Sequence, residues 1–157
     1  PTNRVVAEFV GSPPMNLWTG MLERQDDITV LWTSNSRASG ETLRFQGPVA
    51  LPTRWDVSRR YVFGVRPEAV ALLEDRTKPQ EEGWVGEGIV QWTESTGADV
   101  YVHLDVAGAR CISRQPSGRS FLHNQSYRIH CHPSEVSWFD AESGMRLETG
   151  DPSISGP

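Results

Sequence analysis

The chain has 157 residues, of which 37% are hydrophobic and 22% are charged, and its formal net charge at pH 7 is −5. This composition is typical of one globular domain with an ordinary apolar core, and the acidic balance disfavours a nucleic-acid binder, which usually needs a positive surface to displace counterions. No apolar run approaches the roughly 18 residues of a transmembrane helix. The start at Pro1, without a secretion leader, indicates an excised piece.

The first predicted element is a short helix over residues 3–11, NRVVAEFVG. Asn3 can cap its N-terminus, apolar residues recur at helical spacing, and Gly11 ends it before two prolines. The elements after it are predicted to be strands, because residues of high β propensity alternate with short stretches rich in Asp, Ser, Gly and Pro. These strands cover residues 17–24, 27–33, 59–65, 88–92, 97–106 and 126–132. One short helix followed by many short strands favours a small barrel or a sandwich.

Polar stretches separate the predicted strands. Residues 34–41 and 74–83 are predicted to be exposed loops, and residues 150–157 a mobile tail. In the strand with the clearest pattern, Val102 and Leu104 alternate with Tyr101 and His103, which predicts one buried face and one wet face.

Catalytic motifs are absent from the sequence. A phosphate-binding P-loop needs glycines followed by Lys-Ser or Lys-Thr, whereas the single lysine, Lys78, has no glycine loop before it. No GxSxG or HExxH motif is present either. Two cysteines, Cys111 and Cys131, are too few for a disulfide framework and are predicted to be small core residues in a reducing cytoplasm. The chain by itself is therefore predicted to be no enzyme and to hold no cofactor.

Histidine and tryptophan supply two further candidates for binding. On a strand, His130 and His132 share a face opposite Cys131, and could chelate zinc or nickel only if a third ligand came from elsewhere. We favour the alternative, in which both histidines lie on a wet face with a core cysteine between them. The six tryptophans are spread along the chain, so most are expected to fill the core or its rim, while one or two could stack on a ligand.

Residues 61–70, YVFGVRPEAV, interrupt an apolar strand with charged residues. Gly64 permits a bulge or a close backbone approach. Pro67 ends the ladder and forces Arg66 to be extended. Glu68 can cap free amides of a turn or pair with an arginine. The segment is either a rigid corner that presents a charged pair or an ordinary transition from strand to turn.

This segment resembles the (I/V)-G-(I/V)-R-P-E signature in the C-terminal domain of ATPase subunits of carbohydrate ABC importers, of the maltose, multiple-sugar and glycerol-3-phosphate type. Three other stretches resemble the same family in the correct order. The positions that match are Ser12, Pro13, Pro14, Met15 and Asn16, then Glu94, Gly97 and Asp99, then Phe139, Asp140, Ser143, Gly144 and Leu147. Val5 and Trp138 depart from the family pattern. The Ser-Ala-Arg-Asn stretch of molybdate-binding relatives is missing, which argues against oxyanion storage.

The resemblance implies an all-β fold, a small OB-like barrel of the TOBE/MOP-like kind with a short N-terminal helix. Residues 1–16 would end the linker helix from a missing nucleotide-binding domain, residues 17–149 would form the regulatory domain, and residues 150–157 a flexible tail. The chain would be the regulatory and dimerisation domain of an ATP-binding subunit that energises import of a sugar or glycerol phosphate. It would be non-catalytic, while the missing domain of the parent subunit would hydrolyse ATP with Mg.

The resemblance also implies partners and a location. The expected partners are a second copy, the chain's own nucleotide-binding domain, the membrane subunits of the transporter, and a regulatory protein or metabolite, but no nucleic acid. The expected location is cytoplasmic and peripheral, at the inner face of the cell membrane. The alternative function is a domain that senses a sugar or an oxyanion and thereby regulates transport.

Thirteen residues are expected at interfaces or in structural roles. The Ser-Pro-Pro turn should be stiff and transmit rotation, and Arg66 is expected to pair with a carboxylate. The full set is Ser12, Pro13, Pro14, Asn16, Gly64, Arg66, Pro67, Glu68, Glu94, Gly97, Phe139, Asp140 and Gly144.

Overall fold

The computed structural model describes residues 2–9, 11–25, 28–33, 42–46, 55–74, 83–106 and 108–149. Within these ranges one short helix precedes eleven strands, which confirms the all-β prediction. The elements are α1 (Arg4–Phe9), β1 (Asn16–Gln25), β2 (Ile28–Thr33), β3 (Thr42–Gln46), β4 (Arg60–Val65), β5 (Ala71–Leu73), β6 (Gly83–Ser95), β7 (Asp99–Val106), β8 (Ala109–Pro116), β9 (Ser126–Cys131), β10 (Val136–Asp140) and β11 (Arg146–Leu147). The predicted loop at 34–41, most of the loop at 74–83 and the tail at 150–157 lie outside the described residues.

The helix begins where the sequence predicts. The Val6 backbone N–H donates to Asn3 Oδ1 over 2.9 Å, so Asn3 is the N-terminal cap. Gly11 follows with a φ of 115°, a conformation that glycine adopts readily. The chain therefore turns sharply between α1 and β1.

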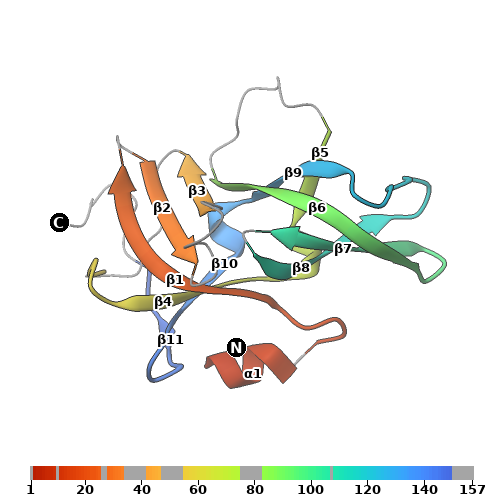
Figure 1. Ribbon diagram of the computed structural model, residues 1–157. Helices are drawn as coiled ribbons and strands as arrows, with labels where there is room; N and C mark the ends of the chain where they lie inside the picture. Colours follow the sequence, from red (N-terminus) through yellow and green to blue (C-terminus); the bar gives the residue numbers. More distant parts are fainter. Residues whose placement is uncertain are drawn as a thin grey trace.

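The strands form one curled sheet, whose order is β11-β10-β4-β1-β2-β3-β6-β7-β8, and β9 pairs with both β6 and β5 (Figure 1). The pairings are antiparallel throughout. Strand β6 is the longest and joins the two halves of the molecule. Its first residues pair with β3 and its later residues with β7, while its other edge pairs with β9.

Strands β5, β9, β6, β7 and β8 form a barrel that side chains close. Between β8 and the segment before β5, Ser113 Oγ donates to the Val70 carbonyl over 2.6 Å, and Gln115 Nε2 donates to the same carbonyl over 3.3 Å. Arg119 Nη2 donates to the Leu72 carbonyl over 3.3 Å. Side-chain donors thus replace a backbone ladder at the seam, and they cover strand edges that would otherwise be open.

Tryptophans fill the core, as predicted. Trp18, Trp84 and Trp138 are fully buried and surround Phe63. The ring centroids of Phe63 and Trp84 lie 4.8 Å apart, and those of Trp84 and Trp138 lie 5.5 Å apart, both edge-on. Aromatic rings prefer this geometry. Trp92 differs, because it is 48% exposed.

The two cysteines are free and buried, which confirms their predicted place in the core. Burial raises the pKa of the Cys131 thiol to about 12. Burial also raises the pKa of Cys111 well above its ordinary value. Both thiols are therefore protonated at neutral pH.

The prediction that both neighbouring histidines lie on a wet face is wrong for His130. Its exposure is only 8%, whereas His132 is exposed. The cause is that β9 lies between β5 and β6, and the imidazole packs so closely over Gly83 that a Cβ there would lie 2.5 Å from His130 Nε2. Among the residues that the structure describes, no group of three or more His, Cys, Asp or Glu residues could hold a metal ion.

Candidate functional site

The corner that interrupts the apolar strand has the predicted backbone. β4 ends at Val65, and Arg66 is extended with φ −75° and ψ 150°. Pro67–Ala69 then forms one turn of 3-10 helix, in which the Val70 N–H donates to the Pro67 carbonyl over 3.4 Å. Pro67 is buried and Glu68 is exposed. The missing N–H of Pro67 thus coincides with the end of the ladder.

Gly64 provides a close approach rather than a bulge. It pairs in regular register with Leu17 of β1 and Ser137 of β10. A Cβ on Gly64 would lie 2.7 Å from Met15 Sδ and 3.1 Å from Phe139 Cε2. Phe139 is fully buried, and it forms a small cluster with Met15 and Val62. Only glycine therefore fits under these two side chains without a shift.

Arg66 lies beside the link between α1 and β1. A Cβ on Gly11 would lie 3.5 Å from Arg66 Nη1, so the guanidinium is close to the Ser-Pro-Pro turn. In that turn Ser12 and Pro14 are exposed and Pro13 is half-buried. No carboxylate of the described side chains forms an ion pair with Arg66, so its predicted partner is not found among them. The other charged residue of the corner, Glu68, acts on a different arginine: the hydrogen bond and charge of Asp99, and more weakly the charge of Glu68, raise the pKa of Arg114.

Asn16 connects the two halves of the sheet. Its Nδ2 donates to the Ile112 carbonyl over 2.8 Å, and its Oδ1 accepts from the Ile112 N–H over 2.7 Å. The buried side-chain amide thus satisfies both backbone groups of one residue in β8, as a neighbouring strand would. Trp18 adds a second link, because its Nε1 donates to the Val106 carbonyl over 3.1 Å.

Asp140 organises the turn between β10 and β11. Its Oδ1 accepts from the Ser143 N–H over 2.7 Å, from Ser143 Oγ over 2.9 Å and from the Glu142 N–H over 3.1 Å. Its Oδ2 accepts from Arg59 Nη2 over 2.9 Å. The Ser143 hydrogen bonds, and then the Arg59 charge, lower the pKa of this buried carboxyl. Gly144, with a φ of 72°, closes the turn by donating its N–H to the Asp140 carbonyl over 2.8 Å.

The same turn holds the N-terminal segment. The Arg4 N–H donates to the Gly144 carbonyl over 2.8 Å, and the Arg146 N–H donates to the Thr2 carbonyl over 3.2 Å. Asn3 and Met145 form an antiparallel β-bridge between these two bonds. We call this set of backbone contacts the N-terminal clamp. It fastens the start of α1 to the β10–β11 hairpin (Figure 1).

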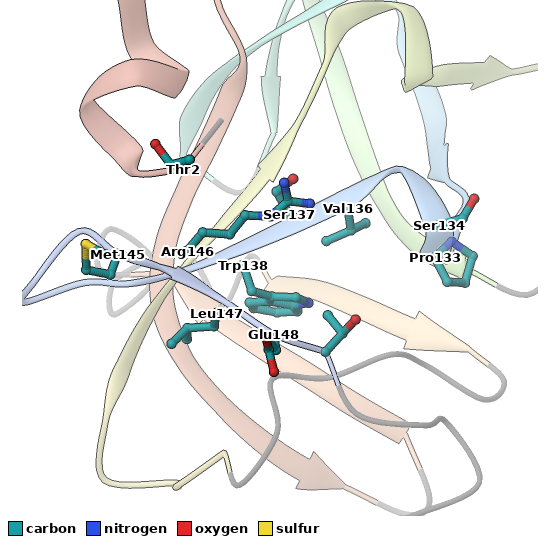
Figure 2. Close-up of a pocket in the computed structure, with 11 residues that line it drawn as sticks. Thr2, Pro133, Ser134, Val136, Ser137, Trp138, Met145, Arg146, Leu147 and Glu148 are labelled. Carbon is teal, nitrogen blue, oxygen red and sulfur yellow. The ribbon is translucent and has the colours of Figure 1, made fainter.

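A groove of about 890 Å³ lies beside the clamp (Figure 2). Thr2, Ser137 and Arg146 supply polar groups to its wall, and Figure 2 shows the Arg146 side chain running toward Ser137. Trp138 also lines it but has an exposure of 0%. The groove therefore offers polar contacts rather than an open indole face.

Glu94 belongs to a separate network on the outer face of the barrel. Its Oε2 lies 2.7 Å from His103 Nε2, and Arg110 Nη2 lies 3.0 Å from His103 Nδ1. Because a guanidinium only donates, Nδ1 accepts and Nε2 carries the hydrogen that is donated to Glu94. The Trp92 ring stacks on the His103 ring at 4.5 Å with an angle of 15°. We call these four residues the Trp92 cluster.

Sequence reasoning named Glu94 but missed its three neighbours. Simple alternation along residues 88–92 would place Trp92 on the same face as Val90, which is in the core. A β-bulge between Val90 and Trp92 reverses this, so that Trp92 pairs with the outward-facing His103. The one available signal was His103 itself, because it alternates with buried Val102 and Leu104.

The predicted residues thus fall into three places rather than one site. The Gly64–Glu68 corner meets the Ser-Pro-Pro turn and Phe139. Asp140 organises the β10–β11 turn, and Gly144 of that turn belongs to the N-terminal clamp. Glu94 lies at the far end of β6, followed by Gly97, which has a φ of 86° in the turn to β7. Within the described residues no helix is both long and apolar enough to span a membrane.

Comparison with known proteins supports the family and the fold that the sequence motifs predict. Residues 63–139 match the TOBE domain family. The chain is 30% identical over 155 residues to the sn-glycerol-3-phosphate import ATP-binding protein UgpC of Yersinia enterocolitica, which covers 95% of this chain and 38% of that protein. It is also 30% identical over 151 residues to UgpC 2 of Agrobacterium fabrum, with 95% and 35% covered. The chain thus spans little more than a third of these relatives.

A solved structure has the same fold. The cytoplasmic molybdate-binding protein ModG superposes with a TM-score of 0.60 at 14% identity, over 78% of this chain and 94% of ModG. At this identity the likeness concerns the fold alone. Residues 63–139 therefore form a TOBE domain, and nearly the whole length of the chain is similar to the C-terminal region of ATP-binding subunits of sugar ABC importers.

Proposed function

We propose that the chain is the regulatory and dimerisation domain of an ATP-binding subunit that energises import of a sugar or glycerol phosphate by an ABC transporter. The similarity to UgpC over 95% of the chain supports this role. The parent subunit would contribute the nucleotide-binding domain, ATP and Mg, and the TOBE domain itself would carry out no reaction. Through the membrane subunits, the chain would sit at the inner face of the cell membrane.

The observation that carries the proposal is the N-terminal clamp. A domain that precedes α1 would act on the barrel through this helix. Two backbone hydrogen bonds, of 2.8 Å and 3.2 Å, form the Asn3–Met145 β-bridge that joins the start of α1 to the β10–β11 hairpin. β10 pairs directly with β4, which leads into the Arg66 corner. These contacts would thus transmit a rotation of α1 to the sheet, because no flexible linker lies between the start of the helix and the hairpin.

The proposal predicts that loss of the Asp140 turn uncouples the domain. In a reconstituted importer that carries the full-length subunit encoded by this chain's gene, we expect Asp140→Ala to lower ATP-driven solute uptake several-fold. The reason is that the Ser143 and Glu142 amides lose their acceptor, so the turn that presents the Gly144 carbonyl to α1 loosens. Nucleotide binding by the subunit should not change.

The matched control is Glu142→Ala in the same turn, because this side chain is exposed and its backbone contact survives. Uptake that is equally insensitive to both substitutions would reject the coupling role.

Dimerisation is tested separately by sedimentation of the isolated chain, for which we expect a mass near twice 17.5 kDa. A chain that is still monomeric at roughly 100 µM, a concentration at which even a weak dimer would form, would reject the dimerisation role.

A further inference from the structure

We propose that the Trp92 cluster is a binding site for a neutral sugar ring, with the open face of Trp92 as the stacking platform. The cluster lies on the outer face of β6, β7 and β8, away from the N-terminal clamp. Sugar binding at this cluster would use none of the contacts of the N-terminal clamp.

The backbone sets the outward position of the Trp92 side chain. Without the bulge at Gln91 the indole would face the core, and with it the indole faces outward. The bulge is itself held in place, because Asn124 N–H donates to the Val90 carbonyl over 2.8 Å and His123 Nδ1 lies 2.9 Å from the Gln91 carbonyl. Bulges of this kind often re-aim a side chain next to a functional site.

The indole is also held rigidly. His103 covers one of its faces at 4.5 Å, and Arg110 Cζ lies 5.2 Å from its centroid. His103 is itself fixed by Glu94 on one nitrogen and Arg110 on the other, with an exposure of only 3%. Arg110 bonds to His103 in the plane of an imidazole that lies nearly parallel to the indole, so both residues cover the same face, and the 48% exposure of Trp92 belongs mainly to the other face and the ring edge. A platform that is already ordered loses little entropy when a ligand binds.

Polar groups on either side of the platform fit a polyol. Glu94 is 63% exposed at its side chain and uses Oε2 for His103, so its Oε1, which bonds to none of the described residues, can accept a hydroxyl hydrogen. Arg110 donates only one N–H to His103, so further N–H groups can donate to hydroxyl oxygens. A sugar presents C–H groups on a ring face and hydroxyls around its edge, which matches an aromatic face flanked by an acceptor and a donor.

Charge and area favour a neutral small ligand over other occupants. The Glu94 carboxylate offsets the Arg110 guanidinium beside the platform, so no net positive charge is left there to attract a phosphate, and the chain as a whole carries a net charge of −5. A stable protein interface needs about 800 Å² per partner with an apolar centre. Among the described side chains of β6, β7 and β8, Ile89 and Trp92 are the exposed large apolar ones, which is too small a patch.

The test follows two signals by heteronuclear NMR while glucose, maltose, glucose 6-phosphate or glycerol 3-phosphate is added: the backbone amide of His103 in every variant, and the Trp92 indole N–H where it is present. We expect glucose or maltose to shift these signals and to bind at least roughly tenfold more weakly to Trp92→Ala, the loss that one aromatic contact represents. Val57→Ala, which removes another exposed apolar side chain in a different part of the chain, should bind as the wild type does.

Glu94→Gln provides a second test that keeps the indole in place. It should weaken binding of the neutral sugars several-fold and reduce their advantage over the phosphorylated ones, because the carboxylate charge is removed. Three results would overturn the proposal: no shift with any sugar up to roughly 50 mM, a range that reveals millimolar dissociation constants; tighter binding of the phosphorylated probes to the wild type; or sugar binding that Trp92→Ala leaves unchanged. A drop in self-association in Trp92→Ala, without sugar binding, would assign the surface to a protein partner instead.

Discussion

At the scale of single residues, Asp140 shows how one buried carboxylate defines a local structure. Its Oδ1 accepts two backbone N–H groups and a hydroxyl, and its Oδ2 accepts from Arg59, which is 56% exposed at its side chain. Because these donors favour the charged form, the pKa of the carboxyl lies below its ordinary value of 3.8, with the Ser143 hydrogen bonds as the largest cause. The turn is therefore coupled to pH.

This coupling predicts a pH dependence of stability. A lowered folded-state pKa contributes stability above pH 3.8, and this contribution is lost as the pH falls through the folded-state value. At pH 7 we expect Asp140→Asn to lower the free energy of unfolding by about 1–2 kcal/mol, as for loss of a capping acceptor. The difference from the wild type should shrink as the pH falls below 3.8 and through the lowered folded-state pKa, because the wild-type carboxyl is then protonated as well.

Urea unfolding at pH 7 and at an acid pH below the folded-state pKa of Asp140 measures this difference, and Glu142→Gln is the control, since it removes an exposed charge from the same turn. A gap between Asp140→Asn and the wild type that is equally large at both pH values would mean that the carboxyl charge has no part in the turn.

At the scale of elements, the strands with alternating apolar residues could be predicted and the others could not. In β8 the inward-facing residues Ser113 and Gln115 are polar, because they close the barrel by bonding to the Val70 carbonyl. In β10 every residue is buried, so no period of two exists. The fold class, the cap of α1 and the end of β4 follow from local sequence. The partners of Glu94 and the bulge that exposes Trp92 depend on long-range pairing, which a single sequence does not encode visibly.

The contact of Asn16 in β1 with Ile112 in β8 yields a prediction at this scale. Replacing Asn16 by alanine leaves both backbone groups of Ile112 without their partner in a buried place. We expect a loss of about 2–3 kcal/mol in unfolding free energy, because a buried donor and a buried acceptor are left unsatisfied. The Ile112 amide should exchange with deuterium faster than in the wild type, and by a larger factor than the Ile129 amide in β9.

For comparison, Thr19→Ala alters a half-buried residue of the same strand β1 and leaves the Ile112 contacts intact. Equal exchange rates at Ile112 in the wild type and in Asn16→Ala would show that β8 finds another partner at this edge.

At the scale of the whole molecule, the two halves of the sheet share one core. β6 pairs with β3 in one half and with β7 and β9 in the barrel. Trp18 and Trp138 from the first half belong to the same hydrophobic cluster as Cys111 and Cys131 from the barrel. Neither half can lose its structure without exposing apolar surface of the other. Regulation would therefore act by movement of the domain as a body rather than by opening of the barrel.

This shared core predicts that the barrel and the first half unfold in one transition. In urea at pH 8, we expect the loss of tryptophan fluorescence and the labelling of cysteines by a thiol reagent to have the same midpoint. In the folded state the thiols are unreactive, because burial excludes the reagent and raises the pKa of Cys131 to about 12, so little thiolate exists. Cys131→Ala and Cys111→Ala separate the reporters, the first leaving a thiol in β8 and the second a thiol in β9. If Cys111 alone were labelled at a lower urea concentration, the seam that Ser113 and Gln115 close would open before the rest, and the barrel could then act as a switch.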